Sequence, residues 1–254
     1  MAAAGPGRAA AGRGRRRRVL AGASRWRLAS VAATPAAAQV QGRGAMNALA
    51  APAQRLLRYR ARVQALAGQA SPPPPLCDQA AFRRAWAGAV PLRRQELVVA
   101  ALQLDGLPAA CFDDADSELA LLEPAPLQQL LLARALYARS DALRHCIERA
   151  RRQWLAERLG PSVWQWLRGC PASPTWVPLL ECGNDAHAHA WCQDGWCRLV
   201  ADGLWPWSGL ARLAAASAGL DPDSAVLAGD GGSRDFIAQW RIFAQYNTIW
   251  ENAA

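Results

Sequence analysis

The charged residues divide this chain at Met46 into two parts of different character. All 29 basic residues are arginine, and nine of them precede Met46, whereas all 20 Asp and Glu residues follow it. Residues 1–45 are therefore rich in Arg, Ala and Gly and contain no acid. Such a segment buries too little apolar surface to offset the entropy cost of ordering, so we expect it to be a disordered extension. The remaining 20 Arg and 20 acids cancel, so the part that folds is electrically neutral.

Three interpretations of residues 1–45 stay open. Translation from Met46, the second of two Met residues, would make the segment a misassigned start. An Arg-rich, acid-free segment also suits a mitochondrial transit peptide, whereas Arg25 and Arg27 interrupt the apolar stretch that a secretory signal requires. The same arginines suit a nucleic-acid-binding arm, and the neutral remainder would then bind no nucleic acid.

Composition also indicates the compartment. No run of 18 or more apolar residues occurs, so we expect a soluble protein without a membrane span. Seven Cys residues, an odd number in a chain too long to need disulfides, favour a reducing cytoplasm. We therefore expect most of these cysteines to be small core residues.

Proline and hydrophobic spacing predict three segments after Met46. Residues 46–70 contain an amphipathic helix, from Ala53 to Ala67, which Gly68 can cap. Residues 71–77 form a Pro-rich linker that no helix can cross, so the first helix is separable from the rest. Residues 78–254 are expected to be a helical domain with a Trp-rich C-terminal part.

Apolar periodicity with caps, prolines or glycines at the ends predicts the helices of that domain. They are a helix after Asp78 with Phe82 and Trp86 on one face, Pro91 to Gln103, a helix start near Asp113, Asp114 and Asp116, Leu127 to Arg139, Asp141 to Leu159, Pro161 to Gly169, Ser208 to Ala218, and Asp235 to Trp250. Trp176-Val177 and Trp196 to Val200 are candidate short strands, and Gly229 to Gly232 reads as a flexible loop. The fold class is thus mainly α, a compact multi-helix domain, with a small β element in the C-terminal third as the alternative.

Asp141 to Leu159 is the clearest of these helices. Leu143, Ile147, Ala150 and Trp154 recur at spacings of four, three and four, which predicts a buried stripe. The opposite, solvent-exposed face carries Arg144, Arg151 and Arg152, which are candidate partner-binding residues.

Cysteine and histidine cluster near the C-terminal third. The candidate ligands, all types that zinc prefers, are Cys182, His187, His189, Cys192 and Cys197. Only Cys192 and Cys197 have a spacing typical of a zinc knuckle, and a redox pair of the two is an alternative. We expect a packed loop whose His residues face water, with no metal.

Other chemistry is not indicated. His145 and Cys146 are adjacent on a predicted helix and point about 100° apart, so they cannot act as a dyad. Gly229 to Gly232 lacks the Lys and Ser/Thr of a phosphate loop, and no calcium loop follows Asp113 to Asp116. We therefore expect no catalytic residue, no cofactor and no enzymatic activity.

Tryptophan is unusually frequent, and ten of the twelve residues lie between Trp154 and Trp250. At this density Trp either fills a core or anchors an interface. Trp205 and Trp207 flank Pro206 in a predicted turn, and we expect them to be exposed and to bind a partner.

The segment from Leu127 to Gly160 resembles the central helices of the SctK (YscK-like) family of bacterial type III secretion systems. In that family a Leu-rich helix leads to an L-R-x-x-I stretch, matched by Leu143, Arg144 and Ile147, and then to an Arg-rich helix ending in L-G, here Leu159 and Gly160. Neither the first 45 residues nor the Trp-rich part and the Cys/His cluster take part in this resemblance.

The resemblance implies a non-enzymatic cytoplasmic adaptor of the sorting platform. It would link the inner-membrane ring protein SctD to the pod protein SctQ, and would reach the cytoplasmic face of the inner membrane through these partners. The alternative is a small helical metal-binding or redox protein that uses Cys182 to Cys197.

Overall fold

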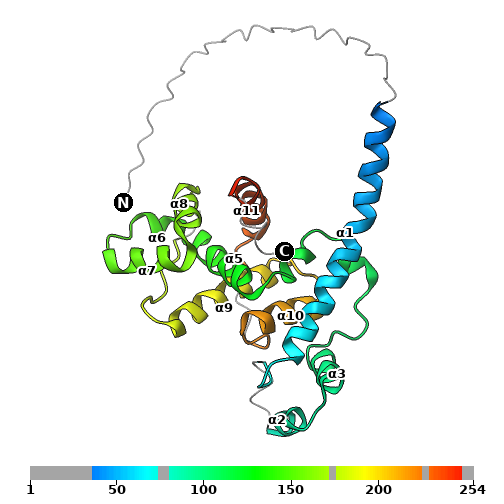
Figure 1. Cartoon of the computed structure of the whole chain (residues 1–254). Coiled ribbons are helices and arrows are strands. Elements are labelled where there is room, and N and C mark those ends of the chain that lie inside the picture. The colour runs from blue at the N-terminus through cyan, green and yellow to red at the C-terminus, as the bar shows by residue number, and fades with distance from the viewer. Residues whose placement is uncertain (1–35, 74–79, 172–175, 225–228, 248–254) are drawn as a thin grey trace, which may run out of the picture. The chain divides into compact units, whose positions relative to one another are not determined.

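The computed structural model describes residues 36–73, 80–171, 176–224 and 229–247, and these ranges contain helices and no strand (Figure 1). The helices are α1 Ala36–Ala67, α2 Ala80–Ala87, α3 Pro91–Ala101, the 3₁₀ turn η2 Ala109–Phe112, α4 Ser117–Ala120, α5 Pro124–Tyr137, α6 Ser140–Arg144, α7 Arg149–Leu159, α8 Pro161–Gly169, α9 Asp185–Ala201, α10 Ser208–Ala218 and α11 Ser233–Asn247. The mainly α prediction is confirmed. The strand alternative is wrong, because Trp196 to Val200 belong to α9 and Trp176-Val177 have no regular structure.

Helix α5 is the centre of the fold, because it contacts each of the helices from α6 to α11 (Figure 1). It begins at Pro124, and a proline suits the first turn of a helix, where the missing N–H costs nothing. Its sequence is apolar around most of its circumference, and Leu127, Leu130, Leu131 and Leu136 are fully buried. A helix of this kind must be surrounded on several sides.

The closest helix packing is between α5 and α9. Gly195 of α9 lies directly against the backbone of Leu131 in α5, so that a Cβ at position 195 would overlap the Leu131 carbonyl group. Only glycine permits this approach, because any side chain would push the helices apart.

Gly195→Ala is expected to reduce the free energy of unfolding by about 3 kcal/mol or more, since the added methyl meets backbone that cannot rotate away. Urea unfolding followed by circular dichroism measures this. Gly169→Ala is the matched control, because a Cβ there meets no atom within 4 Å at the end of α8. It should leave stability unchanged or raise it by up to about 1 kcal/mol. Equal effects of the two substitutions would contradict the close approach.

Helix α1 is longer and more firmly attached than predicted. It begins at Ala36, inside the segment expected to be disordered, and passes through Pro52; the expectation for residues 1–35 falls outside the described residues. Alanine favours helix even where little surface is buried, so composition alone misplaced this boundary.

Arginines of α1 bind the η2–α4 region, although the sequence suggested a separable helix. Arg55 donates to the Phe112 carbonyl at 2.9 Å, and Arg58 pairs with Glu118 at 2.6 Å. Val63 is buried in the same core as α5. The chain after the predicted linker therefore packs against the helix that precedes it.

The predicted helix Asp141 to Leu159 is wrong, because it is broken. Helix α6 ends at Arg144 and α7 starts at Arg149, and Ile147, predicted to be buried, is 87% exposed. Helix α7 buries Leu155 and Leu159 instead. Both helices contact α8, and the break allows each to do so independently. No proline or glycine marks the break, so only tertiary packing determines it.

Three arginines are buried near the junction of α5 and α9. Arg139, between α5 and α6, makes a bidentate pair with Asp194 of α9 at 2.6 and 2.9 Å, and Arg198 binds the same carboxylate at 2.8 Å. Arg134, with no exposed surface, pairs with Asp202 at 3.0 Å and also with Asp230. Buried guanidinium groups are stable only when they are paired in this way.

The loop before α11 is closed onto this cluster, which corrects its interpretation as a flexible loop. Asp230 bridges Arg134 and Arg198, with 2.7 Å to the latter, and the Gly231 amide donates to Asp202 at 2.9 Å. A Cβ at Gly229 would overlap the Asp202 carboxylate. Glycine in this loop therefore serves close packing.

These contacts control ionisation of the carboxylates. Burial by itself would raise the pKa of Asp230, but the hydrogen bond and charge of Arg134, the Gly232 amide and the charge of Arg198 outweigh it and lower the pKa to about 2. The pKa values of Asp194 and Asp202 are likewise lowered against the effect of burial, by arginines for Asp194 and by Ser233, Gly231 and Arg134 for Asp202.

The stability that Asp230 contributes should therefore be complete above pH 4 and should be lost as pH falls towards about 2, because the folded state must then bind a proton that it disfavours. Urea unfolding between pH 7 and pH 2 measures this. Asp230→Asn should have a lower free energy of unfolding than wild type at pH 7, and this free energy should fall less steeply than that of wild type as the pH is lowered. An unchanged acid dependence in the variant would contradict the role of Asp230.

Candidate interaction surface

The residues of the predicted Cys/His site lie on and just before one helix. His187, His189, Cys192 and Cys197 belong to α9, and Cys182 precedes it. Asn184 caps α9, its side chain accepting a hydrogen bond from the His187 amide at 2.8 Å. Successive residues of a helix are rotated by about 100°, so these spacings send the side chains in different directions.

Three of these side chains meet different neighbours. The Cys192 thiol donates to the Gln128 carbonyl of α5 at 3.5 Å, Cys197 lies 4.0 Å from the Ser224 hydroxyl, and His187 lies 3.1 Å from Glu181. Within the described ranges, no three His, Cys, Asp or Glu residues meet in a geometry that could hold a metal ion. The predicted loop is a helix, and its five candidate ligands do not converge.

The thiols are held in their neutral form. Burial raises the pKa of Cys192 to about 12 and that of Cys170 to about 11, and it also raises the pKa of Cys182. Nucleophilic and metal-binding cysteines need the thiolate, so these residues behave as core residues.

The predicted exposure of Trp205 is wrong. Its ring is 3% exposed, and its Nε1 donates to the Asp116 carbonyl at 3.1 Å, while Trp207 is half-buried against the core. The Asp116 carboxylate pairs with Arg241 of α11 at 2.6 Å, so it contributes to tertiary packing. Trp176, which is 59% exposed, is instead the most open Trp that the structure describes.

The predicted partner-binding residue Arg144 lies at a surface hollow. A hollow of about 560 Å³ between α6, α7 and α8 is lined by Arg144, Ala156, Pro161, Trp164, Gln165, Arg168 and Gly169. Arg144 donates to the Cys170 carbonyl, which orients it at the edge. Arg151 and Arg152 lie on α7, where Arg151 pairs with Glu148 at 3.5 Å and Arg152 is exposed.

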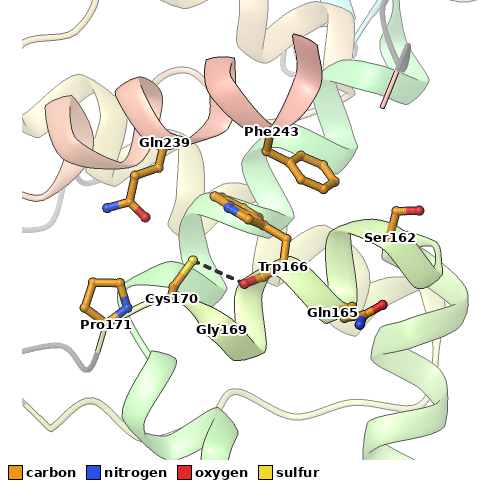
Figure 2. Close-up of a pocket in the computed structure, with 8 residues that line it drawn as sticks. All are labelled: Ser162, Gln165, Trp166, Gly169, Cys170, Pro171, Gln239 and Phe243. Carbon is orange, nitrogen blue, oxygen red and sulfur yellow. Dashed lines mark hydrogen bonds between the residues drawn. The ribbon is translucent and has the colours of Figure 1, made fainter. Parts of the chain in front are cut away.

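A second hollow, of about 470 Å³, lies on the other side of α8, between α8 and α11. Figure 2 shows Trp166 of α8 between Gln239 and Phe243 of α11. The Trp166 and Phe243 rings stack, with centroids 5.1 Å apart and planes at 24°. Gln165 and Gly169 line both hollows, so the two form one continuous surface across α8.

We call this region the α8 surface and define it by Arg144, Arg152, Trp164, Gln165, Trp166, Arg168 and Phe243. The sequence indicated Arg144 and Arg152 but not the aromatic half. Trp164 and Trp166 are two positions apart in α8, and only the packing of α11 decides which of them meets Phe243.

A third hollow lies between α1 and α3. This α1–α3 groove, of about 600 Å³, includes Tyr59, Val63, Leu92 and Val99 among its lining residues. Leu92 is 67% exposed at its edge. The groove shares no residue with the α8 surface.

Comparison with known families identifies the chain. The model of HrpB4, a bacterial type III secretion protein family, matches residues 10–228. The chain belongs to this family. HrpB4 is the SctK-like family of these systems, so the family predicted from the resemblance is confirmed. No curated protein and no solved structure matches the chain.

The HrpB4 match extends well beyond the 34 residues from Leu127 to Gly160 that suggested it. It includes the α9 helix with its Cys and His residues and most of the Trp-rich part, and it begins within the Arg-rich segment. No helix among the described residues of this HrpB4-family protein is long and apolar enough to span a membrane.

The raised pKa values predict that Cys170 and Cys192 of the folded protein react with iodoacetamide at pH 8 about a hundredfold or more slowly than in guanidinium chloride, where burial is lost. Peptide mass spectrometry over time measures each rate. Equal rates in the two conditions would contradict the burial, and stoichiometric zinc that disappears with Cys192→Ser would restore the metal-site interpretation.

Proposed function

We propose that this HrpB4-family protein is a non-enzymatic adaptor of the type III secretion sorting platform. It would link an SctD-like inner-membrane ring protein to an SctQ-like pod protein at the cytoplasmic face of the inner membrane. The observation that carries the proposal is the family match over residues 10–228, together with the adaptor role that the SctK-like resemblance implies.

The arrangement of the surface supports an adaptor. A protein that joins two partners needs two separate docking regions, and the α8 surface and the α1–α3 groove are built from different helices. Both combine apolar side chains with arginines, the composition that anchors protein interfaces. The buried carboxylates of the α5–α9 junction bind arginines, and the thiols of Cys170 and Cys192 are neutral, so these groups support packing rather than catalysis.

The test is reconstitution of the link. The full chain is mixed with the pod protein and the cytoplasmic domain of the ring protein from the same secretion system. Size-exclusion chromatography with light scattering should show a ternary complex that contains ring and pod proteins together only when the chain is present. A ring–pod complex of equal yield without the chain, or a chain that binds neither protein, would refute the adaptor role.

Leu92→Glu tests the α1–α3 groove. A charge at this exposed edge should lower the affinity for one of the two partners by about tenfold or more, because it places an unpaired carboxylate in an apolar contact. The affinity for the other partner should be unchanged. Leu57→Glu is the matched control, since Leu57 is similarly exposed, at 63% against 67%, and does not line the groove. Equal binding by the two variants would exclude the groove as a docking region.

A further inference from the structure

The α6–α8 region carries positive charge that the chain itself does not neutralise. Among the described residues, Arg149, Arg152 and Arg168 are exposed and have no carboxylate partner, and Arg144 donates to the Cys170 carbonyl but pairs with no carboxylate. Elsewhere most arginines have a partner: Arg58 binds Glu118, and Arg212 binds Asp223. The α6–α8 region is therefore locally basic, although the chain after Met46 is neutral as a whole.

These guanidinium groups are gathered around the basic half of the α8 surface. Arg144 and Arg168 line its hollow directly. Ala156 lines the same hollow, and Arg152 lies one turn earlier on the same face of α7, as the i, i+4 spacing requires. Guanidinium groups of α6 and α8 thus line one concavity, and Arg152 of α7 lies one turn from it.

The other half of the α8 surface is apolar. The hollow beside Trp166 and Phe243, at about 470 Å³, falls in the range of ligand-binding clefts, about 300 to 1,000 Å³. Gln165 is exposed and lines both halves, so an occupant can touch the arginines and the rings together.

We propose that the α8 surface binds an acidic segment of a partner protein that also presents a bulky apolar side chain. The carboxylates pair with Arg144, Arg152 and Arg168, and the apolar side chain enters the hollow between α8 and α11. Arginine suits this task because its planar guanidinium binds carboxylates with two parallel hydrogen bonds. The inference rests on the proposed function and specifies the chemistry of one of its partners.

A second copy of the chain fits this surface less well, because many of its own carboxylates are already paired. Asp116, Glu118 and Asp223 bind Arg241, Arg58 and Arg212. A lipid surface also fits less well. A membrane-bound helix inserts an apolar face, whereas α7 buries Leu155 and Leu159 in the core and leaves a polar face outward.

The test compares charge variants of the full chain. The pod protein and the ring protein's cytoplasmic domain are the probes, and their affinities are measured by titration calorimetry at low and high salt. Arg152→Glu/Arg168→Glu should weaken binding of one partner by about thirtyfold or more, since it places like charges opposite each other, and wild-type binding of that partner should weaken as salt rises. Gln165→Glu replaces the side chain by one of nearly equal size and shape that carries a negative charge, and it should lower the affinity for the same partner by about three- to tenfold.

Two matched controls separate a local effect from net charge. Arg83→Glu/Arg84→Glu makes the same charge change at exposed positions of α2, and Gln54→Glu repeats the amide change on an exposed position of α1. Both control variants should bind each partner with an affinity within about twofold of that of wild type. Thermal unfolding of each variant confirms that the fold is intact.

The outcomes distinguish this inference from the proposed function. If wild type binds both partners and Arg152→Glu/Arg168→Glu binds them equally well, the inference is wrong and the adaptor role stands. If wild type binds neither partner, both fail. If Arg152→Glu/Arg168→Glu keeps its binding to both partners but no longer sediments with phosphatidylglycerol vesicles as wild type does, the surface binds a membrane. If the variant instead loses a self-association that wild type shows, the surface binds a second copy. Either result would overturn the proposal.

Discussion

The pairing of buried arginines between α5 and α9 is the interaction on which the rest of the structure depends. Arg134, Arg139 and Arg198 are at most 8% exposed, and each is neutralised by a carboxylate of α9 or of the loop before α11. A different arrangement of these segments would leave buried charges unpaired, so the pairs specify how the segments meet. Because Asp230 precedes α11, the cluster also helps to place Phe243 opposite Trp166.

The contrast between the two populations of arginine connects fold with function. At the α5–α9 junction the guanidinium groups are buried and bind carboxylates of α9 and of the segments that follow it. Around α8 they are exposed and lack carboxylate partners among the described residues. Charges of the first kind stabilise one arrangement of the chain, whereas charges of the second kind remain available to another protein.

Local signals predicted the ends of several helices because their causes are local. Pro91, Pro161 and Gly219 begin or end helices where expected, since proline lacks an N–H and glycine adopts the left-handed conformation, with φ of 75° at Gly219. The same reasoning failed for Asp141 to Leu159. The break at 145–148 carries no proline or glycine and exists because α6 and α7 each pack against α8. It failed for Trp205 for a similar reason, because a turn next to a core can face inward.

The sequence by itself determined the helical class, the neutrality of the chain after Met46, the family and two arginines of the α8 surface, because composition, periodicity and motif spacing are properties of neighbouring residues. Only the tertiary structure decided that the Cys and His residues of α9 diverge, that Gly229 to Gly232 closes onto an ion cluster, and that Trp166 meets Phe243 beside arginines that pair with no carboxylate of the described residues. Each of these depends on atoms far apart in the chain, and the burial that brings them together is a property of the whole core.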